Sequence, residues 1–279
     1  RRAPPPTGVS ADLVLNVSRA IITDDFVTTD LAMEVGLRDG LIERLQGQAV
    51  LPAEPATGSA DGTGPGTIRL RAARDGQSLR FALNSDDAGG SFRSIGFDKM
   101  RGGSLVAVGT APVSDPGRIS ARAVVQDTRI VDVPELEALV SDPAARDAAG
   151  APAGSGVPVE VAEMEVALEG ATLLVRELRA RGPGIGITLQ GEIGLEVDRA
   201  ALTGTFVPAY ALNNAFGEIP IIGDLLIGRE GEGLIGFTFR VSGPLDAPDV
   251  EVNPLSGLAP GFLRRIFEFT PPNLSGPDG

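Results

Sequence analysis

The sequence predicts a mainly β protein, an antiparallel meander whose strands have one apolar face, with a few short helices near the C-terminus. Apolar and polar residues alternate with a period of two over most of the chain, which is the pattern of strands with one buried face. Turn-forming residues are frequent, with 37 glycines and 22 prolines among 279 residues. Only 4% of residues are aromatic, so Val, Leu, Ile and Ala must fill the apolar faces.

The alternating segments are the predicted strands, and each has one apolar face. The pair Asp75-Gly76 lies between two of them, and an Asp-Gly pair in that position is a strong hairpin signal. In chain order the apolar positions are Leu13, Leu15 and Val17; Ile68 and Leu70; Leu79, Phe81 and Leu83; Ile119, Ala121, Ala123 and Val125; Val157, Val159 and Val161; Ile185, Ile187 and Leu189; Ile193, Leu195 and Val197; and Ile235, Phe237, Phe239 and Val241.

Four short segments are helical candidates: 134–141, 208–216, 219–227 and 260–269. The first begins with Pro134, and proline is favoured at the first position of a helix. The last places Phe262, Ile266 and Phe269 on one stripe. That stripe is expected to cap the open end of the sheet, and the alternative is contact with a membrane or a partner.

The segment FGEIPIIGDLLIGREGEG (216–233) is too apolar for an ordinary loop and too broken by proline and glycine for an ordinary strand. We expect it to form a short, bent plug over the last open stretch of sheet, as a fixed cap rather than a moving gate. The predicted cap residues are Ile219, Pro220, Ile222, Leu225, Leu226, Phe262 and Ile266.

The predicted organisation is a single elongated module over 10–269, with 204–269 as its helix-containing C-terminal cap. Residues 1–9 are expected to be a flexible start and 270–279 a disordered tail. The low-complexity stretches 52–66 and 141–156 read as loops, because the strand pattern resumes unchanged beyond them. The opening RRAPPPTG suggests a piece of a longer protein, and no run of about 20 apolar residues predicts a membrane span.

Composition narrows the classes of function. The net charge is −13 and no basic stripe is visible, which argues against nucleic-acid binding because phosphate neutralisation dominates such binding. The chain has no histidine and no cysteine, which removes the commonest general base, zinc ligands and thiol nucleophile. We therefore expect no enzyme activity, cofactor or metal. Asp86-Asp87 with Gly89-Gly90 offers too few ligands for calcium, and a solvated turn is the favoured interpretation.

A dozen or more apolar strand faces need cover, and four short helices cannot supply it. A second sheet, closure of the sheet on itself, or a curved sheet whose apolar face takes up a ligand would each solve this problem. The alternation alone does not choose among these three architectures.

Two stretches of the sequence resemble parts of a known protein family. The stretch 85–110 has the spacing Asp87-x-Gly89, Arg93, Gly96 and Gly102-Gly103, and 204–267 has a longer series of landmarks. Those later landmarks are Pro208, Asn213, Ile219, Pro220, Gly223, Leu225, Leu226, Gly228, Gly233, Gly243, Pro244, Pro248, Asn253, Pro254, Leu255, Pro260, Gly261 and Arg264. Together they resemble the C-terminal region of AsmA-like proteins of Gram-negative bacteria, the subgroup of bridge-like lipid transfer proteins related to YhdP and TamB. The region 141–156 departs from the usual family pattern.

The resemblance implies that the strands form a long curved antiparallel sheet, a β-groove with an apolar inner face. It also implies a periplasmic protein, tethered to the inner membrane by an N-terminal helix that this chain does not include. Its apolar groove would pass the acyl chains of phospholipids between the inner and outer membranes, and other envelope proteins are conceivable partners. The alternative is a structural or assembly module of the cell envelope whose groove is filled by its own side chains. Arg69, Arg71 and Arg80 could meet headgroup phosphates, although solvated outer-face arginines are the simpler interpretation.

The predicted groove-lining residues are the apolar positions of the clearest alternating segments. They are Leu13, Leu15, Val17, Ile68, Leu70, Leu79, Phe81, Leu83, Ile185, Ile187, Leu189, Ile193, Leu195, Val197, Ile235, Phe237 and Phe239.

Overall fold

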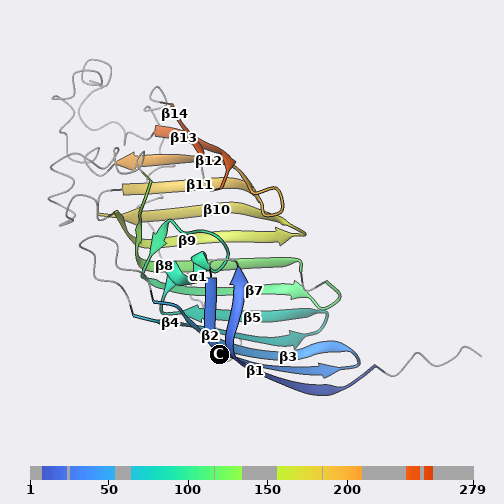
Figure 1. Ribbon diagram of the computed structural model, residues 1–279. Helices are drawn as coiled ribbons and strands as arrows, with labels where there is room; N and C mark the ends of the chain where they lie inside the picture. The colour runs from blue at the N-terminus through green and yellow to red at the C-terminus, as the bar shows by residue number, and fades with distance from the viewer. Residues whose placement is uncertain are drawn as a thin grey trace, which may run out of the picture. The chain divides into compact units, whose positions relative to one another are not determined.

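The computed structural model describes residues 8–23, 26–53, 64–115, 117–133, 156–183, 185–208, 237–245 and 248–253 (Figure 1). These ranges are almost entirely strand. The first strands are β1 (Ala11–Thr23), β2 (Phe26–Arg38), β3 (Leu41–Leu51), β4 (Gly66–Asp75), β5 (Ser78–Ser85), β6 (Met100–Arg101) and β7 (Ser104–Pro112). The later strands are β8 (Ile119–Ile130), β9 (Val157–Glu169), β10 (Thr172–Gly182), β11 (Ile185–Gly194), β12 (Arg199–Pro208), β13 (Phe237–Pro244) and β14 (Asp249–Asn253).

The predicted fold class is confirmed: the protein is mainly β, and its strands form one antiparallel sheet that does not close. Neighbouring strands follow the order of the chain from β1 to β14, except that the short β6 pairs with β8. The successive pairs from β1 to β5, the pair β5–β7 and the successive pairs from β10 to β14 are antiparallel, as expected for strands that turn back directly on their predecessors. Of the three ways of covering the apolar faces, the open sheet is the one observed.

The chain divides into two compact units. Unit 1 takes in the described residues up to Val125 together with Glu165–Gly170, and unit 2 takes in Gln126–Met164 and the described residues from Ala171 onward. The division therefore runs through β8 and β9 rather than through a loop. Each unit is described separately below.

In unit 1 the strand registers place apolar side chains opposite one another from β1 to β7. One row of directly opposed residues is Leu15, Met33, Gly47, Leu70, Leu83 and Ala107. A second row is Leu13, Val35, Leu45, Ala72, Phe81 and Gly109. Directly opposed residues of an antiparallel pair share a face, so both rows belong to one apolar face. At about 4.8 Å between strands, five steps give each row a length of roughly 24 Å.

Unit 2 repeats this arrangement from β10 to β14. One row is Leu178, Leu189, Gly204, Phe239 and Val252. A second row is Val175, Gly191, Leu202, Val241 and Val250. The positions between these rows are polar, in the row Gln190, Thr203, Arg240 and Glu251, and so are those of the next row, Arg179, Thr188, Thr205, Thr238 and Asn253.

Two local predictions have clear outcomes. The Asp75-Gly76 hairpin is confirmed, because β4 ends at Asp75, Gly76 has a φ of 61° and β5 begins at Ser78. The strand predicted through Leu195 and Val197 is wrong, because β11 ends at Gly194 and residues 195–198 form the turn to β12. Asp198 closes that turn with a φ of 50°, a left-handed conformation that aspartate tolerates better than most residues.

The four predicted helices and the plug at 216–233 lie outside the described residues, apart from Pro208 at the start of the second helix, which is instead the last residue of β12. Within the described ranges the one helix is α1 (Ala88–Arg93), which follows β5 directly. The solvated turn predicted for Asp86–Gly90 is therefore wrong, since these residues begin a capped helix and Asp87, Ala88, Gly89 and Gly90 are buried.

Candidate functional site

The apolar face of unit 1, called apolar face 1, brings together every predicted lining residue from the N-terminal half of the chain. The two rows above contain Leu13, Leu15, Leu70, Phe81 and Leu83. The remaining three residues share this face through their registers, Val17 opposite Leu31, Ile68 opposite Ala49 and Ser85, and Leu79 opposite Ala111. The sequence alternation thus becomes a continuous surface because the registers keep one parity over six strands.

Apolar face 2, in unit 2, is built in the same way from β10 to β14. Ile187, Leu189, Ile193 and Phe239 lie on it as predicted, and the backbone registers place positions 185 and 237 on the same face. Leu195 and Val197 do not belong to it, because they lie in the β11–β12 turn, where they are 46% and 68% exposed. Ile235 lies outside the described residues, as do the seven predicted cap residues.

Cover on apolar face 1 is uneven. Leu51 is 2% exposed and Ala49 7% exposed, whereas Leu13 and Leu15 on β1 are 54% and 48% exposed. On β4 and β5, Leu70, Phe81 and Leu83 are half-buried, whereas Leu79 at the start of β5 is 6% exposed. A face that is closed at the Leu51 end and accessible over its middle is a candidate surface for an apolar ligand.

The closed end is formed by α1, which sequence reasoning missed. Gly90 on α1 lies so close to β3 that a Cβ atom there would be 3.2 Å from Cδ1 of Leu51. Arg93, at the end of the helix, has its guanidinium 6.0 Å from the ring centroid of Phe26, a cation–π contact with a fully buried ring. One turn of helix therefore covers the apolar face where β2 and β3 meet it.

Asp87 holds this helix in place. It is 3% exposed, and its Oδ1 accepts a 2.8 Å hydrogen bond from the N–H of Gly90, the arrangement of an N-cap. Its own N–H donates to the hydroxyl of Ser85 at 3.1 Å. The next two N–H groups, of Ala88 and Gly89, donate to the carbonyls of Gly103 and Gly102 at 2.8 and 3.0 Å.

The landmark spacing of the stretch 85–110 thus has a local structural explanation. Asp87 caps α1, Gly102 and Gly103 present their carbonyls to it, and both glycines adopt positive φ values. Gly96, with a φ of 91°, lies in the turn that follows the helix. These positions build the closed end of apolar face 1.

Asp86 does not cap the helix but binds the start of β4. Its carboxylate accepts two hydrogen bonds from Thr67, one from the backbone N–H at 2.5 Å and one from the hydroxyl at 2.6 Å. Partial burial alone would raise the pKa of Asp86, but these hydrogen bonds, with the charge of Arg69, hold the pKa below its usual value. Both aspartates are therefore occupied by structural hydrogen bonds to the start of β4 and to α1.

The arginines considered as headgroup ligands lie on the opposite side of the sheet from apolar face 1. Arg69, Arg71 and Arg80 are exposed, and their registers oppose Gln48, Gln46 and Ala73 on the polar face. Arg80 also forms an exposed ion pair with Asp75 at 2.8 Å. The polar face is thus a solvated surface in which exposed ion pairs contribute little to stability.

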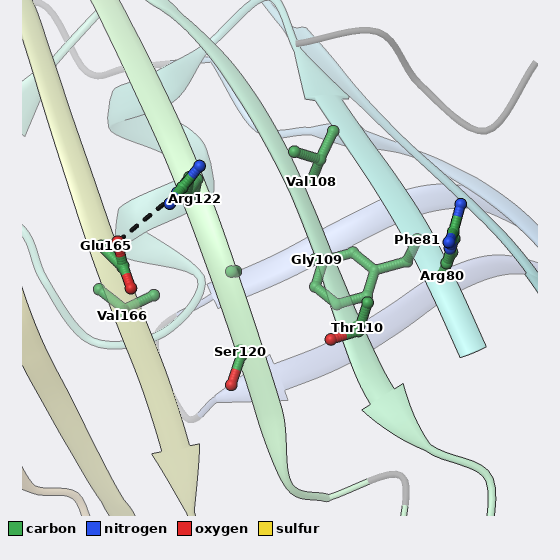
Figure 2. Close-up of a pocket in the computed structure, with 10 residues that line it drawn as sticks. Arg80, Phe81, Val108, Gly109, Thr110, Ser120, Arg122, Glu165 and Val166 are labelled. Carbon is green, nitrogen blue, oxygen red and sulfur yellow. Dashed lines mark ion pairs between the residues drawn. The ribbon is translucent and has the colours of Figure 1, made fainter. Parts of the chain in front are cut away.

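A pocket of about 430 Å³ lies over β5, β7, β8 and β9 in unit 1 (Figure 2). Its lining includes Arg80 and Thr110, which are directly opposed on the polar face, and Arg122, whose Nε is 3.5 Å from Glu165 Oε2. Phe81 and Gly109 also line the pocket, because glycine leaves no side chain at position 109 of β7. The arginines that line this pocket already have carboxylate partners and are well exposed, so the pocket is a weaker candidate site than the apolar faces.

Glu163 on β9 is a half-buried acid in unit 2. Its Oε1 is buried and has no hydrogen-bond partner within the part of the chain that the structure describes. Burial raises the pKa of Glu163 above its usual value, and the positive charges of Arg179 and Arg181 offset this only in part. The folded chain therefore binds this proton more tightly than the unfolded chain.

Replacing Glu163 with glutamine is expected to stabilise the protein at neutral pH. A raised pKa means that Glu163 favours folding below its unfolded pKa of about 4.5 and that this contribution is lost as the pH rises through the folded value. Glu163→Gln should raise the free energy of unfolding at pH 7 and raise it much less at pH 4. Urea titrations at the two pH values measure this, with Glu160→Gln on the exposed side of the strand as the control. An equal effect at both pH values would contradict the assignment.

Comparison with protein-family models, with curated proteins and with solved structures finds no match for this chain. Within the described residues, no helix has the length and hydropathy needed to cross a membrane. The described acidic residues include no group of three or more placed to hold a metal ion.

Proposed function

We propose that this protein binds the acyl chains of phospholipids along apolar faces 1 and 2, as a carrier module of the Gram-negative envelope. The observation that carries the proposal is the set of strand registers, which align aliphatic residues into rows across six strands in unit 1 and five in unit 2. A lipid chain lying along such a row would be removed from water, which contributes about 0.8 kcal/mol for each buried methylene.

Three features support a carrier over an ordinary core. The large residues of apolar face 1 on β1 are about half exposed, and those of the central strands are half-buried. In the described residues the cover supplied by helix is the single turn of α1. Both faces are aliphatic and free of acids and bases along their central rows, so they present a path without strong polar traps.

The resemblance to AsmA-like proteins suggests the setting of this activity: the periplasm, between the inner and outer membranes, with a membrane tether elsewhere in the full protein. The second candidate is a structural module of the envelope whose faces are covered by the protein itself. The buried end of apolar face 1, where α1 packs on Leu51, favours that reading locally.

Native mass spectrometry of protein purified gently from an envelope-containing host tests the proposal. The carrier predicts one or more co-purifying phospholipid masses that are lost on delipidation and regained from vesicles. A chain that remains free of lipid through both steps would support the structural module instead.

A further inference from the structure

We propose that Phe81 and Phe239 are the side chains on which a bound acyl chain rests, and that each ring is held flat against its sheet by a glycine on the neighbouring strand. This inference rests on the proposed function and assigns particular residues to it. Phe81 directly opposes Gly109, and Phe239 directly opposes Gly204, so each unit carries one such pair on its apolar face.

The geometry of the two pairs is nearly the same. A Cβ atom built on Gly109 would lie 2.5 Å from Cζ and 2.8 Å from Cε1 of Phe81. A Cβ atom built on Gly204 would lie 2.6 Å from Cζ and 2.8 Å from Cε1 of Phe239. Each ring thus occupies the space that a side chain on the opposite strand would fill, and it lies along the sheet instead of standing away from it. The same Cβ atoms would also lie 2.4 Å from the backbone oxygen of Ser120 and 2.2 Å from that of Thr188, so a larger residue at either glycine would displace the neighbouring backbone as well as the ring.

The exposure of these rings separates them from core phenylalanines. Phe26 and Phe206 are each 2% exposed, so this fold can bury an aromatic ring completely. Phe81 and Phe239 are half-buried, although they lie in the middle of long strands. One side of each ring is covered by its glycine strand, and the other side adds an uncovered apolar surface to the row.

A flat ring without polar atoms suits an aliphatic chain. Its neighbours in the rows are aliphatic or small, Ala72 beside Phe81 and Leu189 beyond Gly204. The polar groups of the pocket beside Phe81 come from residues outside these rows, among them Arg80 and Arg122, each of which is ion-paired with a carboxylate. Because the ring lies flat, it does not project far above the sheet, so an acyl chain can lie along the row across several strands. The ligand part recognised at both positions is therefore the acyl chain, through dispersion and loss of water.

The test measures binding of a phosphatidylcholine with a pyrene-labelled acyl chain, delivered from vesicles to the full chain. The double substitution Phe81→Leu/Phe239→Leu keeps both positions apolar but removes the rings. It is expected to weaken binding about tenfold, because each ring contributes a large contact area to the bound chain. Phe97→Leu is the matched control, since Phe97 is 42% exposed in the loop after α1 and lies off the apolar face; its binding should change less than twofold.

A second pair of variants tests the role of the glycines. Gly109→Ala should displace the Phe81 ring and weaken lipid binding by the chain that remains folded. It should lower the unfolding midpoint as well, because its Cβ would also lie 2.4 Å from the backbone oxygen of Ser120. Gly47→Ala adds the same methyl group to the same face, but there its nearest neighbours would be 3.8 Å and 4.0 Å away, so binding should be unchanged.

The outcomes are distinguishable. Equal binding by the wild type and the double leucine variant would overturn the role of the rings and leave the proposed function standing. A wild type that takes up no labelled lipid would overturn both. If either single substitution, Phe81→Leu or Phe239→Leu, unfolds the chain by circular dichroism, the rings are core residues and the inference is wrong.

Discussion

Replacing Leu189 with aspartate is expected to abolish photocrosslinking of phospholipid to unit 2 while the chain remains folded. Leu189 lies at the centre of apolar face 2, opposite Leu178 on β10 and Gly204 on β12, and its side chain is half-buried. Without lipid, a carboxylate at this position can stay hydrated. With an acyl chain over it, the carboxylate must lose water, which costs several kcal/mol and should reduce crosslinking more than tenfold. A phospholipid with a diazirine in its acyl chain gives the readout.

Two aspartate substitutions control for charge alone. Thr188→Asp puts the same charge on the adjacent residue, whose register places it on the polar face opposite Arg179 and Thr205. Leu195→Asp changes a leucine that is 46% exposed in the β11–β12 turn. Both variants should crosslink like the wild type. If Leu189→Asp aggregates or loses its β-sheet circular dichroism, the face is a packed core and the carrier reading is contradicted.

The second large effect concerns stability. Asp87→Ala is expected to lower the free energy of unfolding by about 2 kcal/mol, because it removes a buried N-cap and leaves the N–H of Gly90 without its acceptor. Since α1 closes one end of apolar face 1, the part of the sheet beneath α1 should also exchange its amide hydrogens faster in this variant than in the wild type. Guanidinium titration and hydrogen exchange over β3 and β4 measure the two effects.

Asp87→Asn is the matched variant, since its side-chain oxygen can still accept from Gly90. It should lose less than half as much stability as the alanine variant. A loss below about 0.5 kcal/mol for Asp87→Ala would mean that α1 is not held by its cap.

Much of this fold follows from alternation that can be read in the sequence. Leu79, Phe81 and Leu83 alternate with polar neighbours, and the Asp75-Gly76 turn sets which strand they pair with. Once the hairpin registers keep a constant parity, each strand's apolar residues fall on the same face as those of its neighbours. The members of apolar face 1 were therefore predictable, although no short-range signal tells an open sheet from a closed one or from two stacked sheets.

The two features that were predicted wrongly, α1 and the β11–β12 turn, are places where the local sequence pattern and the tertiary structure disagree. In α1, Gly89 and Gly90 both disfavour helix, so the segment reads as a turn; tertiary contacts with Leu51 and Phe26, together with the Asp87 cap, stabilise it. An aspartate three residues before Gly90 was the available signal for the cap. At Leu195 and Val197 the period-two pattern continues by coincidence into a turn, where Asp198 takes a left-handed conformation.

The Phe–Gly pairs show a third limit of sequence reading. Phe81 and Gly109 are separated by 28 positions in the sequence, and only the register of β5 against β7 places the ring over the glycine. Glycine within a strand usually weakens it, and a cross-strand aromatic ring compensates by covering the exposed backbone. Such a pair becomes visible once the pairing of strands is known.

The central claim, that acyl chains lie on the apolar faces and not on the polar ones, can be tested with single-tryptophan variants, because the chain has no tryptophan of its own. Phe81→Trp and Phe239→Trp place the reporter on apolar faces 1 and 2, and Arg80→Trp and Arg240→Trp place it one residue away on the polar faces. The measurement is fluorescence quenching by phosphatidylcholine with brominated acyl chains. The proposed function predicts strong quenching at positions 81 and 239 and little at 80 and 240; equal quenching at all four positions, or none at any, would contradict it.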